Sequence, residues 1–170
     1  MNNKIITSFG SAFIKPNELL YSQAEEIGKY IAEAGHTICS GGYYGTMEAI
    51  SKGAKSAGGK TIGISVKGWE NKVNHFIDED VMAENLMERI LKLINIADAY
   101  IIFKGGTGTL LEISAALELM NKKAMPEKRM IFYSGFWRNV IDVLREDSEN
   151  TNALIERNIV FINRPDEFKL

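Results

Sequence analysis

The stretch from Lys104 to Glu112, KGGTGTLLE, combines residues that can bind a phosphate with one that can do acid–base chemistry. Its glycines let the backbone approach a ligand closely, and the helix that follows presents free N–H groups and the positive end of its dipole. Thr107 and Thr109 add hydroxyl donors. Glu112 lies one helical turn, about 5 Å, inside that helix, where its carboxylate would repel a bound anion. A chain that accepts this repulsion is expected to use the carboxylate.

Two further predicted strand ends carry small residues, at Gly10-Ser11 and in the turn from Gly41 to Gly45. In open α/β sheets, ligands bind at the carboxyl ends of the strands, near the point where the strand order reverses. A single glycine turn is most simply a tight connection between a strand and a helix. Two glycine-rich turns together with Gly10-Ser11, on strands expected to be neighbours, favour phosphate binding instead. The predicted binding residues are Gly10, Ser11, Gly41, Gly42, Gly45, Thr46, Lys104, Gly105, Gly106, Thr107, Gly108 and Thr109.

Glu112 and an arginine of the preceding helix both border apolar faces. On a wheel of 100° per residue, Glu112 lies at the edge of an apolar arc. That arc consists of Leu110, Ile113, Ala116, Leu117 and Met120. An acid in the first turns also complements the helix dipole, which would be a sufficient reason for an exposed glutamate.

Arg89 borders the face that we predict to pack in the core. This face consists of Leu86, Met87, Ile90, Leu91, Ile94 and Ala97. On spacing alone, such an arginine is more simply a surface residue that extends its charge into water. It gains importance if the fold places it over the glycine loop.

Apolar strands alternate with amphipathic helices along the chain. The predicted strands are residues 4–9, 36–40, 60–66, 98–103, 129–133 and 159–162. The predicted helices are residues 17–34, 46–56, 83–97, the segment from the glycine loop to about 121, and 137–145. A less regular stretch is expected over residues 67–81, and a polar surface loop after Asp147.

The predicted strands are continuously apolar, as in a sheet that is covered on both faces. The sequence therefore predicts an α/β fold with a Rossmann-like, doubly wound, mainly parallel sheet flanked by helices. It shows no internal repeat, low-complexity segment or linker, so we expect one nucleotide-binding domain over residues 1–170.

The composition is that of an ordinary globular protein, with 45% hydrophobic and 25% charged residues. The net charge of −2 and the absence of a basic run argue against nucleic acid as a partner. The one cysteine, Cys39, cannot form an internal disulfide, which fits a reducing compartment. With no signal peptide or apolar span, we expect a cytoplasmic protein without a membrane partner.

Several common cofactor and metal motifs are absent. There is no GxxxxGK[ST], and no GxGxxG follows the first strand, so a P-loop nucleotidase and a NAD enzyme are both disfavoured. His36 and His75 have no second ligand at metal-binding spacing, so no metal site is predicted. A pyridoxal-dependent decarboxylase would need a buried Schiff-base lysine, and the pattern singles out only Lys104, whose position suggests phosphate. We therefore predict no cofactor.

With these residues in place, the chain resembles the LOG (Lonely Guy) family. Its members are cytokinin-activating phosphoribohydrolases and bacterial relatives, often mislabelled lysine decarboxylases. Arg89 precedes Asp98 by nine residues, and an apolar strand and the GGxGTxxE stretch ending at Glu112 follow, as in that family. The family's earlier turn, GGGxxGxM, is matched by Gly42 to Met47 with Gly41 in front.

The resemblance implies hydrolysis of the N-glycosidic bond of a nucleoside 5′-monophosphate, of the AMP or cytokinin-ribotide type. The products would be the free base and ribose 5-phosphate. Arg89 and Glu112 would be the catalytic pair, the glycine–threonine loops would hold phosphate and ribose, and the protein would be a homo-oligomer, most simply a dimer.

The chain also departs from the LOG pattern. Lys104 replaces a proline, Tyr43 stands in the triple glycine, Ile90 replaces a lysine and Leu111 an acid. A related branch, the molybdenum-cofactor-carrier-like proteins, binds a phosphorylated pterin without such chemistry. Non-catalytic binding of a nucleotide or a phosphorylated cofactor is therefore the alternative function.

Overall fold

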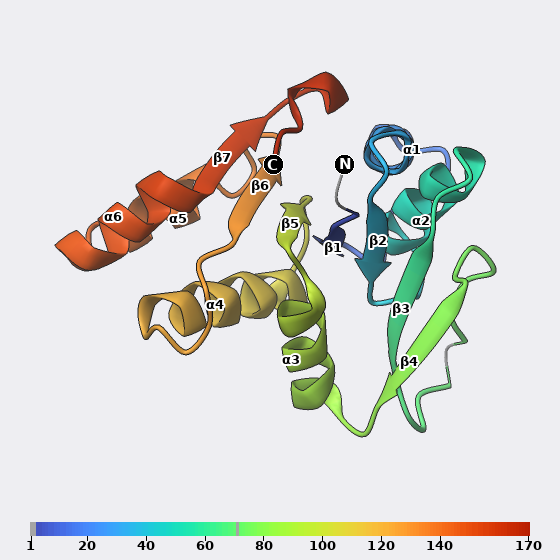
Figure 1. Cartoon of the computed structure of the whole chain (residues 1–170), viewed down its shortest axis with the longest axis horizontal. Coiled ribbons are helices and arrows are strands. Elements are labelled where there is room, and N and C mark those ends of the chain that lie inside the picture. Colours follow the sequence, from blue (N-terminus) through green and yellow to red (C-terminus); the bar gives the residue numbers. More distant parts are fainter. Residues whose placement is uncertain (1–2, 71) are drawn as a thin grey trace.

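The structure is a computed structural model that describes residues 3–70 and 72–170. Within these residues, seven parallel strands form one sheet in the order β4-β3-β2-β1-β5-β6-β7 (Figure 1). The strands are β1 (Ile5–Phe9), β2 (Thr37–Ser40), β3 (Thr61–Val66), β4 (Glu79–Ala83), β5 (Ala99–Ile102), β6 (Arg129–Tyr133) and β7 (Ile159–Ile162). The helices are α1 (Leu19–Glu33), α2 (Thr46–Ser56), α3 (Leu86–Ile96), α4 (Thr107–Asn121), α5 (Arg138–Arg145) and α6 (Glu149–Asn158). The predicted α/β fold is confirmed.

The chain winds outward from the middle of the sheet in both directions. From β1 it passes through β2 and β3 to the edge strand β4, then returns to β5 on the other side of β1 and continues to β6 and β7. The strand order therefore reverses between β1 and β5. The loops after these two strands are joined by a hydrogen bond, in which the backbone N–H of Ser11 donates to the carbonyl of Lys104 over 3.2 Å. Two of the three predicted glycine turns thus lie side by side.

Helices cover both faces of the sheet, as the continuously apolar strands predict. In β5, Ile101 contributes to the core formed with α1 and α2, whereas Tyr100 and Ile102 contribute to the core formed with α3, α4, α5 and α6. The same alternation in the neighbouring strands gives two apolar layers, one on each side of the sheet. In Figure 1, α1 and α2 lie together beside β2, while α3 and α4 lie below β5 in the view.

The prediction for residues 67–81 is wrong only in its last three residues, because β4 begins at Glu79 and pairs in parallel with β3. This edge strand carries exposed acidic residues at Glu79 and Asp80, so it lacks the apolar run by which the other strands were recognised. The predicted helix start at residue 83 is wrong for the same reason. Ala83 ends β4, and α3 begins at Leu86 after Asn85, whose side chain accepts a hydrogen bond from the N–H of Glu88 over 3.0 Å.

The polar segment after Asp147 is a helix, α6, and not the predicted surface loop. Ser148 caps its start, and the Ser148 hydroxyl accepts a hydrogen bond from the N–H of Thr151 over 3.2 Å. Only Leu154 and Ile155 are buried, so the apolar signal in the sequence is short.

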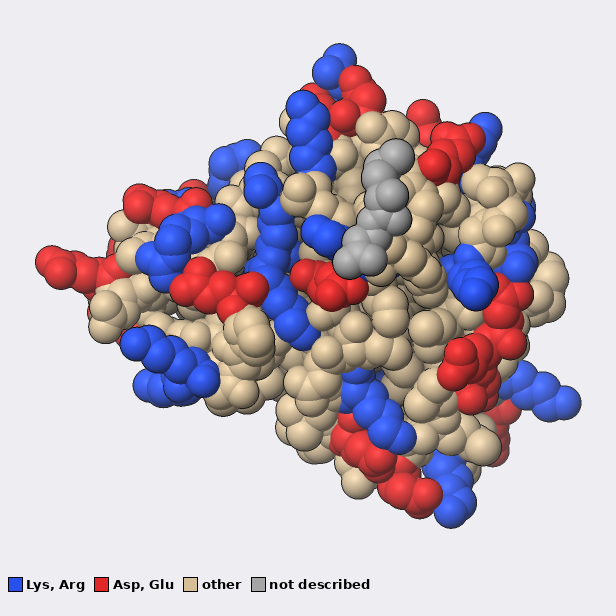
Figure 2. Space-filling model, viewed as in Figure 1, with Lys and Arg blue, Asp and Glu red and all other residues tan. Residues whose placement is uncertain are grey.

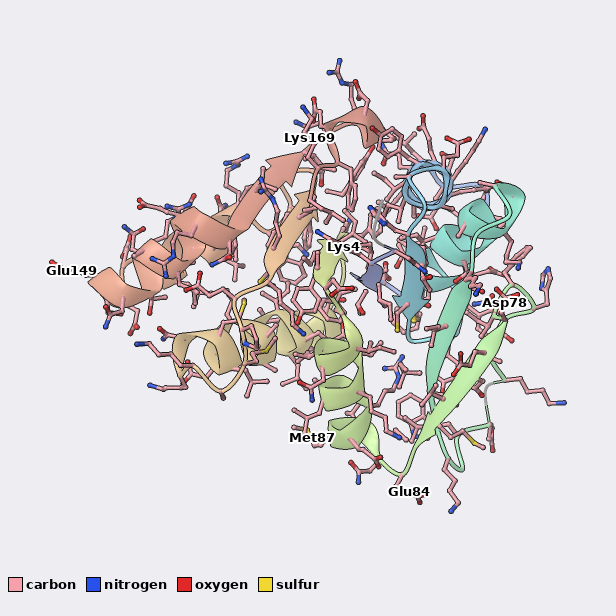
Figure 3. All side chains as sticks on the ribbon, in the orientation of Figure 1. Lys4, Asp78, Glu84, Met87, Glu149 and Lys169 are labelled. Atoms are coloured by element: carbon pink, nitrogen blue, oxygen red, sulfur yellow. The ribbon has the colours of Figure 1, made fainter. Side chains whose placement is uncertain are left out.

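The predicted core face of α3 is also partly wrong. Leu86, Met87 and Leu91 are 43%, 57% and 44% exposed. Figure 3 labels Met87 near the start of α3. Ile90 and Ile94 are buried as predicted. Leu110, predicted to lie in the apolar arc of α4, is 36% exposed as well.

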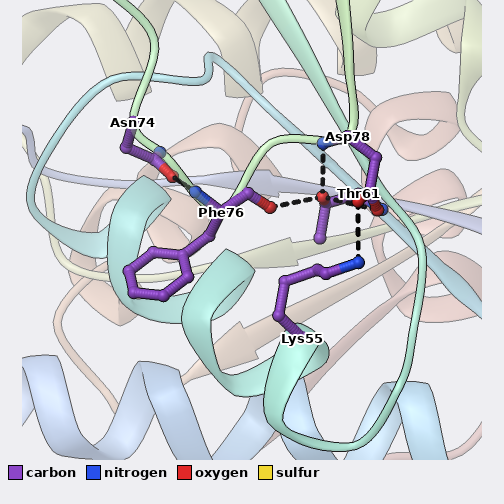
Figure 4. A network of polar contacts seen from close by, with 5 residues as sticks. All are labelled: Lys55, Thr61, Asn74, Phe76 and Asp78. Carbon is purple, nitrogen blue, oxygen red and sulfur yellow. Dashed lines mark hydrogen bonds and ion pairs between the residues drawn. The ribbon is translucent and has the colours of Figure 1, made fainter.

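The segment between β3 and β4 is attached to the sheet by a polar network (Figure 4). The carboxylate of Asp78 accepts hydrogen bonds from the Lys55 ammonium over 2.7 Å and from the backbone N–H of Thr61 over 3.0 Å. The Thr61 hydroxyl donates to the carbonyl of Phe76. These contacts hold the end of the segment that leads into β4. The beginning of the same segment, at Trp69, lines the cavity described below.

Charges of both signs are interspersed over the face of the molecule that Figure 2 shows. Among the described helices, none is both long enough and apolar enough to cross a bilayer.

Candidate active site

A cavity of about 270 Å³ opens where the strand order reverses, at the carboxyl ends of β1 and β5. It gathers residues from distant parts of the chain. The predicted site residues that line it are Gly10, Ser11, Arg89, Gly106, Thr107, Gly108, Thr109 and Glu112. The remaining lining residues are Ala12, Phe13, Tyr43, Met47 and Trp69. The two predicted catalytic residues and the predicted phosphate loop therefore share one cavity.

The start of α4 forms one wall of this cavity. Its first residue, Thr107, follows Gly106, and no side chain caps the first turn. A Cβ on Gly106 or Gly108 would meet no atom within 4 Å, so the backbone here is open to a ligand. An uncapped helix start with free N–H groups in an open cavity can bind an anion such as phosphate.

The other predicted binding residues do not line the cavity. Thr46 donates from its backbone N–H and its hydroxyl to the carbonyl of Ser11, over 2.9 and 3.1 Å, and so fixes the loop after β1. The place of a Cβ on Gly105 is taken by the side chain of Thr109. Lys104 is exposed, with its ammonium 5.4 Å from the ring centroid of Phe136. Gly42 and Gly45 lie with Gly41 in the buried turn after β2.

Arg89 is only 8% exposed, so it is not the surface residue that spacing alone favours. Its Nε donates a hydrogen bond to the carbonyl of Ile64 over 2.7 Å. The guanidinium carbon lies 5.3 Å from the ring centroid of Tyr43 and 5.8 Å from that of Trp69. These distances allow a cation–π attraction to both rings. One carbonyl and two aromatic rings thus hold a buried cation at the cavity.

Gly41 makes the position of Arg89 possible. A Cβ on Gly41 would overlap the guanidinium of Arg89 and crowd the sulfur of Met47. The sequence predicts that Gly41 helps to bind phosphate. The structure places it behind Arg89, outside the cavity wall.

Glu112 lies on α4, half-buried and lining the cavity. Burial raises its pKa to about 7, although the positive charge of Arg89 acts in the opposite direction. Burial likewise lowers the pKa of Arg89, and the charge of Glu112 opposes that change. Among the ion pairs within 4.0 Å of the described residues, none joins these two side chains. A carboxyl group with a pKa near neutrality, beside a fixed cation, is typical of a general acid or base.

Two aromatic residues of the cavity are not among the predicted site residues, although one lies in the segment 67–81, from which sequence reasoning expects recognition of the base. Trp69 and Phe13 both line it, and they are 46% and 90% exposed. A signal was present for Trp69, a tryptophan directly after Gly68 in a stretch without clear periodicity. For Phe13 the sequence offers only its closeness to Gly10-Ser11.

Other parts of the structure offer weaker candidate sites. A larger cavity of about 630 Å³ lies between α4, α5 and α6, lined by residues such as Leu117, Leu144 and Leu154. No glycine loop lines it. Among the described residues, no group of three or more His, Cys, Asp or Glu side chains is placed to hold a metal ion.

Fold and cavity together define a doubly wound α/β protein with a cavity at the point where the strand order reverses. The chain belongs to the SLOG cluster4 family, a LOG-like family whose model matches residues 3–159. The LOG resemblance that the sequence motifs predict is therefore confirmed.

Two relatives match part of the chain. An uncharacterised protein of Archaeoglobus fulgidus is 37% identical over 102 residues, which cover 60% of this chain and 67% of that protein. A cytokinin riboside 5′-monophosphate phosphoribohydrolase of Mycobacterium tuberculosis is 33% identical over 97 residues, covering 55% of this chain and 52% of the relative. The match thus spans about half the length of that phosphoribohydrolase.

A solved structure matches nearly the whole chain. The molybdenum cofactor binding protein of Rippkaea orientalis superposes with a TM-score of 0.75 at 26% identity, over 98% of this chain and 93% of that one. The chain is thus similar both to a named hydrolase and to a named binding protein.

Proposed function

We propose that this protein hydrolyses the N-glycosidic bond of a nucleoside 5′-monophosphate, of the AMP or cytokinin-ribotide type. One observation carries the proposal: Glu112, with a pKa raised to about 7, lines the same cavity as the uncapped start of α4. An anion site and a titratable acid one helical turn apart suit a nucleotide. Its phosphate would bind at the anion site, and its reacting ribose carbon, C1′, would lie near the acid. The named activity of the mycobacterial relative supports this assignment.

In the proposed complex, the N–H groups at the start of α4 and the hydroxyls of Thr107 and Thr109 bind the phosphate. The ribose lies beside Glu112. The bond between ribose C1′ and the base nitrogen breaks, its electron pair leaves with the base, and the ribose gains oxocarbenium character. Ionised Glu112 stabilises this positive charge and accepts a proton from the water that attacks C1′. The departing base takes up one proton, and ribose 5-phosphate remains.

Arg89 has a fixed orientation in this proposal. Its Nε is occupied by the carbonyl of Ile64, so only its terminal nitrogens can donate to a substrate. Its charge also opposes the effect of burial on Glu112, which keeps the carboxylate ionised over more of the neutral pH range. We infer that Arg89 orients the ribose or the leaving base and does not transfer a proton, because a guanidinium does not titrate near neutrality.

The test is chromatography of the purified protein after incubation with AMP, GMP, CMP, UMP and IMP. We expect release of free base from at least one nucleotide, and a loss of turnover by a factor of about 10²–10⁴ in Glu112→Gln. Glu118→Gln is the matched control, because Glu118 lies on the same helix, exposed and paired with Lys122. Equal base release by wild type and Glu112→Gln would contradict the role of Glu112.

The second candidate is a protein that binds a nucleotide or a phosphorylated cofactor without turnover. The similarity over 98% of the chain to a molybdenum cofactor binding protein favours it. This alternative predicts saturable binding of one ligand with no product. It also predicts that Glu112→Gln changes affinity little, while substitutions in the glycine loop weaken binding.

We also propose that the protein acts as a homodimer, as the LOG resemblance implies. The exposed apolar residues of β4, α3 and the start of α4 offer apolar area that a second copy could cover. They are Met82, Leu86, Met87, Leu91, Leu110 and Leu111. Light scattering should give twice the mass of the chain, and a monomer at all concentrations would contradict the dimer.

A further inference from the structure

The cavity is small for a whole nucleotide. Its volume of about 270 Å³ lies below the ~300–1,000 Å³ of most small-molecule sites. If the start of α4 holds the phosphate and Glu112 faces the ribose, the base must project toward the mouth. Two aromatic side chains are exposed there, Trp69 and Phe13.

Trp69 separates two neighbouring cavities. Besides the candidate active site, it lines a second cavity of about 380 Å³ with residues of β3 and β4, among them Val66 and Asp80. Its ring is stacked on that of Tyr43, with the ring centroids 5.7 Å apart and an angle of 24° between the planes. Because 46% of the residue is still exposed, Trp69 can stack with a further ring.

The Tyr43–Trp69 pair is held in place before any ligand arrives. The hydroxyl of Tyr43 accepts a hydrogen bond from the N–H of Val66 over 3.0 Å. The buried amide of Asn74 donates to the carbonyls of Gly42 and Tyr43, over 2.9 and 2.6 Å. This joins the turn after β2 to the segment that carries Trp69. A ring that is already fixed loses little conformational entropy when a second ring stacks on it.

Phe13 lacks this support. It is 90% exposed, and no ring contact to it is among the described aromatic pairs. Ordering its side chain on a ligand would cost rotamer entropy that Trp69 does not lose. The two aromatic residues at the same mouth therefore differ in how well they are prepared to bind a ring.

We propose that Trp69 is the stacking residue that recognises the heterocyclic base, and that Tyr43 and Asn74 are the residues that position it. This inference rests on the proposed nucleotide site. Stacking selects any flat heteroaromatic ring and favours larger ones, so purine nucleotides should bind more tightly than pyrimidine nucleotides. Trp69 also lies near Arg89, and a role limited to shielding that cation is the competing explanation.

Ribose 5-phosphate separates the two explanations, because it has the phosphate and the sugar of AMP but no base. Calorimetry of AMP and ribose 5-phosphate binding would be measured for wild type, Trp69→Ala, Trp69→Phe and Phe13→Ala, with AMP binding measured in the Glu112→Gln background so that turnover does not consume the ligand. We expect Trp69→Ala to weaken AMP binding about tenfold and to leave ribose 5-phosphate binding unchanged. Trp69→Phe should retain most of the AMP affinity, and Phe13→Ala should change it less than Trp69→Ala.

Unchanged AMP affinity in Trp69→Ala, or an equal loss for both ligands, would overturn the inference and leave the nucleotide site standing. A wild type that binds neither ligand would overturn the proposed function as well. A second readout does not depend on the alanine variant. AMP should quench the fluorescence of wild type but not of Trp69→Phe, whose remaining tryptophan, Trp137, is 5% exposed and donates to the carbonyl of Phe103.

Discussion

The two glycine-rich turns of this chain look alike in sequence but differ in what surrounds them. At the start of α4, Gly106 and Gly108 face open space. In the turn after β2, the space beside Gly41 is filled by the guanidinium of Arg89. The first turn is open to a ligand, whereas the second makes room for the protein's own cation. A glycine pattern therefore marks a place where a side chain does not fit, but it does not say what takes that place.

The largest effect is expected from filling the space beside Arg89. Gly41→Ala would place a methyl group where the guanidinium lies, so Arg89 must move. A displacement of about 1 Å at a positioning residue can cost on the order of 100-fold in rate, and we expect at least such a loss in kcat/KM. Gly135→Ala is the control, because a Cβ there has only the Nε of Arg138 nearby, at 3.9 Å. Wild-type activity in Gly41→Ala would contradict the conclusion that the turn after β2 makes room for Arg89.

The second prediction concerns Glu112, which follows the glycine loop on α4. Burial raises the pKa of Glu112 from 4.5 to about 7, so the folded protein binds a proton there that the unfolded chain has released. The stability from this proton is fully present below pH 4.5 and is lost as the pH rises to about 7. Above pH 7, the buried charge costs on the order of 3 kcal/mol.

Glu112→Gln removes this cost. Urea denaturation should show the variant to be more stable than wild type at pH 8, and similar to wild type near pH 4.5. Glu118→Gln should match wild type at both pH values, since Glu118 is exposed. A Glu112→Gln variant that is less stable than wild type at pH 8 would contradict this prediction. It would show that the ionised carboxylate stabilises the folded protein.

The smallest effect is expected at the open turn. Gly108 lies within α4 and has no neighbour at its Cβ position, so Gly108→Ala should raise the free energy of unfolding by about 0.5–1 kcal/mol. The same methyl group would crowd a bound phosphate and lower the affinity for ribose 5-phosphate severalfold. Thermal unfolding and calorimetry measure the two quantities separately. A lower free energy of unfolding with unchanged affinity for ribose 5-phosphate would mean that the glycine loop does not contact the ligand.

The parts of the fold that were predictable are those with an uninterrupted local signal. The apolar runs of β1 and β5 and the helical periodicity of α4 identified their elements. The edge strand β4 was missed because Glu79 and Asp80 point to solvent, where an apolar pattern is not required. α6 was missed because only two of its residues, Leu154 and Ile155, are buried.

The site shows a similar limit. Residue types and spacing predicted that Glu112 and the glycine loop belong to one site, because these lie in one stretch of sequence. Gly41 and Arg89 lie in different elements and meet only through the sheet order, which spacing along the chain does not encode. The exposed leucines of α3 have the same cause, since a helical wheel shows which residues share a face but not which face meets the sheet.

The central claim is that ionised Glu112 drives base release, and the pH dependence of that release tests it most directly. We predict that kcat/KM for the nucleotide that is turned over rises as the pH passes through about 7 and levels off above it. Glu112→Gln should show low activity without this rise. Base release that does not change with pH and persists in Glu112→Gln would contradict the account.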